Sequence, residues 1–256
     1  MEELLNRDIK DIIRQYPQVG DILNEYKVGC VACAAGTCLL KDIMNIHNLA
    51  PETEREMLTR IAGVVWPGRE VKIQERKRES ASRADAAIAP PFRDLIDEHK
   101  LIKRLIALVP DLIVNMDLRS SEGKQLVRAA LNFIRTFADR FHHAKEEDIL
   151  FKYFDSNLDI LKVMHVDHET GRGHVRAVDE AVEKGDMAAA TEHLKAYADL
   201  LTEHIKKEDE ILYPWMARQM SDSQIGRMFS AFSEADQKMA GVAEQAENFV
   251  RELETK

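Results

Sequence analysis

The sequence HHAKEEDILF at residues 142–151 returns in a related form as HIKKEDEILY at residues 204–213. Each copy is a His-x-x-x-Glu pattern followed by an Ile-Leu-aromatic triplet. Residues four apart lie on one face of a helix, one turn apart, so each copy places an imidazole beside a carboxylate. Such a pairing, repeated with the same apolar triplet, is typical of metal sites inside helical bundles.

The composition favours helices and excludes several classes of function. Of the 256 residues, 32% are charged, and the chain has only 11 glycines and 7 prolines. The formal net charge of −9 argues against nucleic acid as the main partner, because phosphate binding needs a basic surface. The acidic start lacks the apolar core of a signal peptide, and no apolar run is long enough to span a membrane. We therefore expect a cytoplasmic protein with no membrane partner.

The apolar spacing predicts an all-α fold with four parts. Residues 1–66 form a small helical domain, 67–91 a linker, 92–220 an up-down four-helix bundle, and 221–256 an extra C-terminal helix. Within the bundle, apolar residues at three- and four-residue steps predict helices over about 92–110, 124–153, 157–184 and 187–216. The first of these is expected to stop at Pro110, because proline disfavours a helix interior. No strand pattern competes with this interpretation.

Each bundle helix carries a histidine within its apolar stripe: His99, His142, His168 and His204. A single such histidine is more often a satisfied core residue, but here all four helices have one, and Glu146 and Glu208 accompany two of them. Buried carboxylates are costly unless they are paired or bind metal, so the pattern predicts cations. Imidazole with carboxylate suits iron, whereas zinc prefers its own tetrahedral site and manganese prefers more oxygen ligands.

Four further histidines are weaker candidates for metal ligands. His165 shares the stripe of His168, so it is a fifth imidazole ligand, a residue that supports a ligand from outside the metal site, or a core residue. His143 has polar residues upstream and is expected to be solvated or to support a ligand from outside the metal site. His174 and His193 lie away from the level of the ligands along their helices and are expected to be structural.

Residues 92 to about 220 resemble a hemerythrin-like (HHE cation-binding) domain. The matching pieces are Asp97-Glu98-His99, His142-x-x-x-Glu146-Glu147, Met164-x-x-x-His168-Glu169 and His204-x-x-x-Glu208. The resemblance implies two non-haem iron ions with an oxo or hydroxo bridge. It implies His99 and His142 on one iron, His168 and His204 on the other, and Glu146 and Glu208 as bridging ligands. Oxygen-carrying hemerythrins have an additional histidine and an aspartate bridge, which this pattern lacks.

Three cysteines, Cys30, Cys33 and Cys38, form a second motif. They could form a redox pair, hold an iron–sulfur cluster with three protein ligands, or bind zinc together with His47; a buried turn of small residues is the alternative without chemistry. The segment resembles the small domain that precedes the bundle in repair-of-iron-centres proteins. Those proteins have adjacent cysteines, which this chain lacks.

The pattern and the resemblance together predict a di-iron protein that binds O₂ or NO, in sensing, scavenging or the response to oxidative and nitrosative stress. One alternative is a di-iron oxidoreductase that reduces NO or peroxide. Another is an iron-delivery or iron–sulfur repair protein that passes iron or electrons to a protein partner. In the C-terminal helix, Met228, Phe229 and Phe232 would then form a contact face, unless they cap the bundle core.

Overall fold

The structure, a computed structural model, describes residues 1–26, 28, 39–47, 49–69, 71, 73 and 89–255. Its regular elements within these residues are helices, and the one bridge outside them pairs Asp8 with Leu39. The all-α prediction is therefore confirmed. The chain divides into two compact units, Met1–Ala86 with Pro214–Gln219, and Ala87–Tyr213 with Met220–Lys256.

The N-terminal unit is built from short helices. These are α1 (Glu2–Leu5), α2 (Ile9–Gln15), α3 (Pro17–Glu25), α4 (Leu40–Ile46) and α5 (Pro51–Val65). Asp8 caps α2, because its carboxylate accepts hydrogen bonds from the backbone N–H groups of Lys10 and Asp11. Proline starts both α3 and α5, where its missing N–H has no intrahelical partner to lose. The apolar faces of these helices share one core, which includes Ile12, Leu23, Met57 and Ile61.

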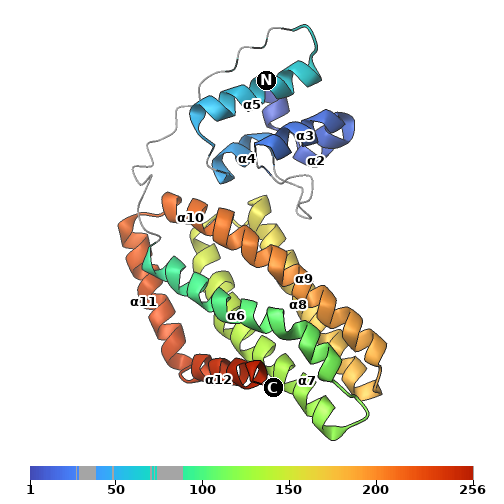
Figure 1. The fold of residues 1–256 in the computed structure, drawn as a ribbon. Coiled ribbons are helices and arrows are strands. Elements are labelled where there is room, and N and C mark those ends of the chain that lie inside the picture. Colours follow the sequence, from blue (N-terminus) through green and yellow to red (C-terminus); the bar gives the residue numbers. More distant parts are fainter. Residues whose placement is uncertain are drawn as a thin grey trace. The chain divides into compact units, whose positions relative to one another are not determined.

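The second unit contains the four-helix bundle (Figure 1). Its first helix is α6 (Pro90–Asn115). The second begins as α7 (Ser121–Phe133) and continues through two π-helical segments, η1 (Ile134–His143) and η2 (Glu146–Leu150), into the 3-10 turn η3 (Phe151–Tyr153). The third is α8 (Asp159–Lys184), which ends at Gly185 in the left-handed conformation. The fourth is α9 (Met187–Lys207), followed by the π-helical η4 (Glu208–Leu212). The chain continues as α10 (Tyr213–Gln219), of which Pro214–Gln219 belongs to the first unit.

The first bundle helix does not stop at Pro110, as the sequence pattern predicted. Pro110 lies inside α6, which continues to Asn115. Leu112 and Met116, beyond the proline, are both buried in the bundle core. Their burial favours continuing the helix and offsets the backbone hydrogen bond that the proline cannot make.

The C-terminal segment forms two helices where one was predicted, α11 (Asp222–Lys238) and α12 (Val242–Glu254). Gly241 separates them with a φ of +88°, a conformation that glycine adopts without strain. Both helices pack on the bundle, and α12 contacts α6, α7 and η1 (Figure 1). Met228 and Phe232 are buried, while Phe229 is exposed, so the three residues do not form one exposed face.

The sequence repeat corresponds to a structural repeat. A five-residue π-helical segment begins at the glutamate of each copy, Glu146 in η2 and Glu208 in η4. In both segments the closing leucine, Leu150 or Leu212, is fully buried. A π-helix has i→i+5 hydrogen bonds and is frequent at functional sites. The repeated sequence therefore adopts the same uncommon winding twice.

The apolar core of the bundle lies at one side of the histidine level. Its members from the four bundle helices, apart from Ile205, follow His99 in α6 and His168 in α8, and they precede His142 in η1 and His204 in α9. They include Leu105, Val109, Leu131, Val182 and Leu194. Because these side chains fix the four helices against one another, the histidines are presented from a rigid scaffold.

Candidate metal centre

Seven buried side chains form two adjacent groups of possible metal ligands. The first group contains His99 from α6, His142 from η1 and Glu208 from η4. The second contains His143 from η1, Glu146 from η2, His168 from α8 and His204 from α9. Within each group, one potential ligand atom per residue lies within 4.8 Å of all the others. All six residues singled out in the sequence are therefore brought together by the fold.

The two glutamates each reach both groups. Glu208 Oε2 lies 3.2 Å from His99 Nε2, and Glu208 Oε1 lies 3.0 Å from His204 Nε2. Glu146 Oε2 lies 3.8 Å from His142 Nε2 and 3.5 Å from His168 Nε2. A carboxylate with this placement can bridge two cations, one in each group.

Four of the imidazoles are oriented by a carboxylate at Nδ1. His99 Nδ1 lies 2.7 Å from Asp209 Oδ1, and His142 Nδ1 lies 2.9 Å from Glu98 Oε2. His168 Nδ1 lies 2.5 Å from Glu147 Oε1, and the fourth pair joins His204 Nδ1 to Asp167 Oδ2 at 3.2 Å. This carboxylate–histidine arrangement is typical of metal-binding histidines, because it holds the proton on Nδ1 and leaves Nε2 as the ligand atom.

A cation accompanies each of these outer carboxylates. Lys103 pairs with Asp209, Lys207 with Asp167, and Arg172 with Glu147. Lys145, which is only 1% exposed, pairs with Glu98 and with Asp236 from α11. Its ammonium group also lies 4.0 Å from the centre of the Phe141 ring and 5.6 Å from that of Phe232. These basic groups balance the negative charge of the outer carboxylates. Within the described residues, Glu146 and Glu208 have no lysine or arginine partner of this kind.

The Nε2 atoms face one another in pairs. His99 Nε2 and His142 Nε2 are 2.9 Å apart, and His168 Nε2 and His204 Nε2 are 3.0 Å apart. With the protons held on Nδ1, each pair would bring two nitrogen lone pairs together unless a proton or a metal ion lay between them. The pKa values of the imidazoles, taken without a metal ion, agree with a shared proton at this position. Burial lowers the pKa of His204, but Glu208 and Asp167 outweigh it and raise the pKa to about 9.

The other group behaves in the same way. Burial acts to lower the pKa of His99, but the hydrogen bond to Asp209 and the nearby carboxylate of Glu208 leave it above its ordinary value. Burial and the neighbouring cationic imidazoles hold the pKa of His142 and of His168 well below the ordinary value. In each pair one imidazole therefore favours the charged form and the other the neutral form, as expected if a proton replaces the metal.

Buried carboxylate oxygens without hydrogen-bond partners also indicate a cation. Glu146 Oε2 and both oxygens of Glu208 are completely buried, and no donor in the described part of the chain makes a well-aligned hydrogen bond to them. Burial and the charge of Glu208 raise the pKa of Glu146 well above its usual range. Tyr213 donates a hydrogen bond of 2.7 Å to the other Glu146 oxygen. Imidazole nitrogens with carboxylate oxygens form a donor set that fits iron.

From the sequence, His143 was expected to be solvated or to support a ligand from outside the metal site, and its burial contradicts the first of these alternatives. It is 5% exposed, and its ring stacks on that of His168 at 3.9 Å between centroids. Both His142 and His143 are buried because they lie at the end of the π-helical η1, where the winding is wider than in an α-helix. The fifth imidazole near the centre is therefore His143. His165 is exposed on α8 and belongs to neither group, which corrects its assignment to the apolar stripe.

The remaining predicted residues lie elsewhere. His174 and His193 face each other with 3.1 Å between their Nδ1 atoms, outside both ligand groups. Cys30, Cys33 and Cys38 lie outside the described residues, so the structure does not bear on their predicted redox or metal-binding role. His47 is half-buried, and burial lowers its pKa.

Comparison with known proteins agrees with the geometry. Residues 91–216 match the model of the hemerythrin HHE cation-binding domain. This range contains all seven ligand candidates, and these residues form a hemerythrin HHE cation-binding domain. The chain thus carries a metal-binding helical bundle.

Uncharacterized proteins of Mycobacterium bovis and Mycobacterium tuberculosis are 23% identical to the chain over 159 residues. The match covers 59% of this chain and 62% of each relative. No solved structure matches the chain significantly. Among the described helices, none has the length and apolar character needed to cross a membrane.

Proposed function

We propose that the chain is a non-haem di-iron protein that binds O₂ or NO. The observation that carries the proposal is the position of Glu146 and Glu208, each within reach of one imidazole of both ligand groups. Two buried carboxylates shared in this way suit two neighbouring metal ions better than a single structural ion.

The two metal positions would be unequal. His99 and His142 would hold one iron, and His143, His168 and His204 the other, with the two glutamates common to both. The group with two imidazoles leaves more room for an external ligand. Ferrous ions at these positions would supply the electrons and the coordination position that a diatomic ligand needs.

The protein residues would orient the ligand atoms and exclude water. The outer carboxylates hold the imidazole rings, and Tyr213 orients Glu146 through its hydrogen bond. Tyr213 also stacks on His99, with 10° between the ring planes. This stacking holds the imidazole ring of His99, which belongs to the first ligand group, in its orientation.

The test is anaerobic reconstitution with ferrous iron, followed by metal counting and optical spectra before and after exposure to air or to NO. The proposal expects two irons per chain and a spectral change with at least one of the gases. His168→Ala should reduce the bound iron, whereas His165→Ala, which alters an exposed imidazole three residues away, should not. One zinc per chain and no response to either gas would contradict the proposal.

The same preparation separates binding from catalysis. With a reductant and excess NO, continued formation of N₂O would show that the centre is an oxidoreductase. A single stoichiometric spectral change would show reversible binding. Transfer of iron to an apo iron–sulfur protein faster than to a chelator would favour iron delivery instead.

A further inference from the structure

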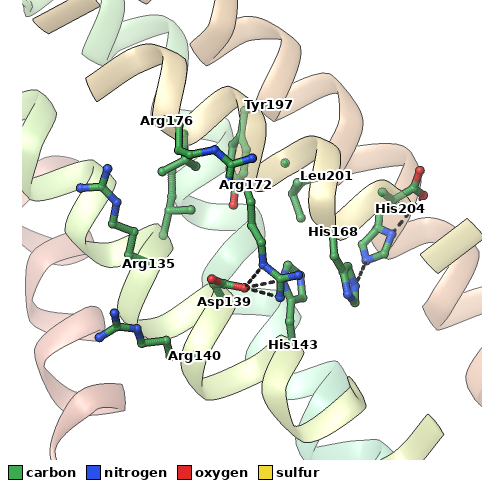
Figure 2. A pocket seen from close by; sticks show the side chains of 14 residues that line it. Arg135, Asp139, Arg140, His143, His168, Arg172, Arg176, Tyr197, Leu201 and His204 are labelled. Atoms are coloured by element: carbon green, nitrogen blue, oxygen red, sulfur yellow. Dashed lines mark hydrogen bonds and ion pairs between the residues drawn. The ribbon is translucent and has the colours of Figure 1, made fainter. Parts of the chain in front are cut away.

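A cavity of about 230 Å³ lies beside the second ligand group, between η1, α8 and α9 (Figure 2). It reaches His143, His168 and His204, while the first ligand group does not line it. Part of its wall is apolar and includes Ile134, Val175 and Leu201. The volume far exceeds what a diatomic molecule occupies and approaches that of a small-molecule pocket.

Four arginines line this cavity. Arg135 and Arg140 come from η1, and Arg172 and Arg176 come from α8 on its other side (Figure 2). Arg135 is paired with Asp179 at 2.6 Å, and Arg172 with Asp139 at 2.7 Å. Arg140 and Arg176 make no ion pair or side-chain hydrogen bond with the described residues.

Two uncompensated guanidinium groups at one cavity are notable in a chain with a net charge of −9. The carboxylates that line the cavity already have partners. Asp139 pairs with Arg172, and Asp167 pairs with Lys207 and His204. The charge left over at the cavity is therefore positive, which favours an anionic ligand.

A buried hydroxyl in the same wall also lacks a partner. Tyr197 is 4% exposed, and its hydroxyl makes no hydrogen bond within the described part of the chain. Leaving a buried hydroxyl unpaired is costly, so a ligand oxygen in the cavity would restore a hydrogen bond.

Gly171 lines the cavity without a side chain of its own. A Cβ atom at this position would meet side-chain carbons of Tyr197 and Leu201 at 3.6 Å, which is ordinary contact. Close packing of α8 on α9 therefore does not require glycine here. The missing side chain instead leaves space in the cavity that Gly171 lines.

We propose that this cavity binds a small organic carboxylate. The carboxylate group would pair with the Arg176 guanidinium, its apolar part would pack against Val175 and Leu201, and the Tyr197 hydroxyl would donate to a ligand oxygen. Arginine forms strong, charge-assisted hydrogen bonds with carboxylates, and the apolar wall favours a ligand with a hydrocarbon part over an inorganic ion. The site depends on groups outside the ligand set, so it does not require the di-iron assignment.

The test is a calorimetric titration of the iron-loaded full-length chain with benzoate, and with neutral benzamide as the matched probe. Benzoate should bind saturably, and benzamide about tenfold or more weaker. Replacing both exposed arginines, Arg140→Gln with Arg176→Gln, should weaken benzoate binding by about tenfold or more and leave the iron content unchanged. Arg227→Gln on α11, far from the cavity in sequence and exposed, should bind benzoate as the parent does.

A second pair of variants tests the shape of the cavity. Gly171→Ala should weaken benzoate binding, whereas Gly226→Ala on α11, which does not line the cavity and where a Cβ atom meets nothing within 4 Å, should not. Undiminished benzoate binding in the double arginine variant would overturn the proposal, because the carboxylate would then bind elsewhere, for example to iron. Equal affinity for inorganic phosphate would overturn the assignment to an organic ligand. Both outcomes can be told apart from failure of the di-iron proposal, which is measured by iron count and gas response.

Discussion

An acidic residue stands directly beside four of the ligand candidates in the sequence: Glu98 before His99, Glu147 after Glu146, Asp167 before His168, and Asp209 after Glu208. In the folded chain each of these acids contacts an imidazole from another helix. In each neighbouring pair, one residue is a candidate metal ligand and the other is a carboxylate that orients a histidine from another helix. The spacing of the inner ligands could be recognised from the sequence, but the partner of each outer acid depends on how the helices face one another.

The outer carboxylates should control metal affinity. Asp209→Asn retains the shape of the side chain but removes the charge that faces His99 Nδ1, and iron affinity should fall by about 10- to 100-fold. Competition with a ferrous chelator measures this. Asp148→Asn is the matched control, because Asp148 is exposed in η2 and its only ion pair within the described residues is with Lys152. Equal affinities for the two variants would contradict the expected role of Asp209.

His143 should contribute to the second metal position. His143→Gln removes an imidazole from the group with Glu146, His168 and His204, so that iron at this position should be held less tightly and its optical spectrum should shift. His165→Gln should change neither the iron content nor the spectrum, since His165 is exposed. If both variants match the parent, His143 is a buried support and not a ligand.

Iron affinity should fall at acid pH. The pKa of His204 is raised to about 9 in the metal-free centre, because Glu208 and Asp167 outweigh the effect of burial. Below that pH the metal must displace a proton, so lowering the pH should weaken binding by about tenfold per unit for each proton displaced. Chelator competition between pH 8 and pH 6, corrected for the chelator's own protonation, measures the slope. An affinity independent of pH would contradict this.

At the level of the helices, the sequence predicted the number and order of the bundle segments but not their winding. The apolar stripe depends on three- and four-residue spacing, which α-helix and π-helix share over a short stretch. The π segments η1, η2 and η4 become visible only when the neighbouring helices are in place. For this reason the sequence identified His142 and missed His143, one residue away. The break at Gly241 was missed because the apolar pattern continues on both sides of it.

Two glycines offer a matched test of helix starts and interiors. A Cβ atom on Gly123, near the start of α7, would lie 2.1 Å from the backbone oxygen of Asp117, whereas one on Gly226 in α11 would meet nothing within 4 Å. Gly123→Ala should therefore lower the free energy of unfolding by about 1–3 kcal/mol. Gly226→Ala should raise it by about 0.5–1 kcal/mol. Denaturant unfolding at fixed iron content measures both free energies. Similar effects at the two positions would contradict the close approach of Gly123 to the backbone of Asp117.

For the molecule as a whole, iron should act as a folding ligand. The metal-free bundle retains two fully buried glutamates among its imidazoles, a costly arrangement that cations relieve. Removing iron with a chelator should lower the melting temperature, and returning ferrous iron without oxygen should restore it. His168→Ala should show a much smaller iron-dependent shift. A melting temperature unchanged by iron in the parent chain would show that the centre does not couple to stability.

The burial of Lys145 limits how short a fragment containing this bundle can be. Its ammonium group is shared between Glu98, which supports His142, and Asp236, which belongs to α11. A fragment cut after the fourth helix would leave that ammonium with half of its counter-charge and would remove the Phe232 ring, whose centre lies 5.6 Å from it. Anyone grafting this centre into another scaffold, or trimming it to four helices, would need to carry the chain at least through residue 238.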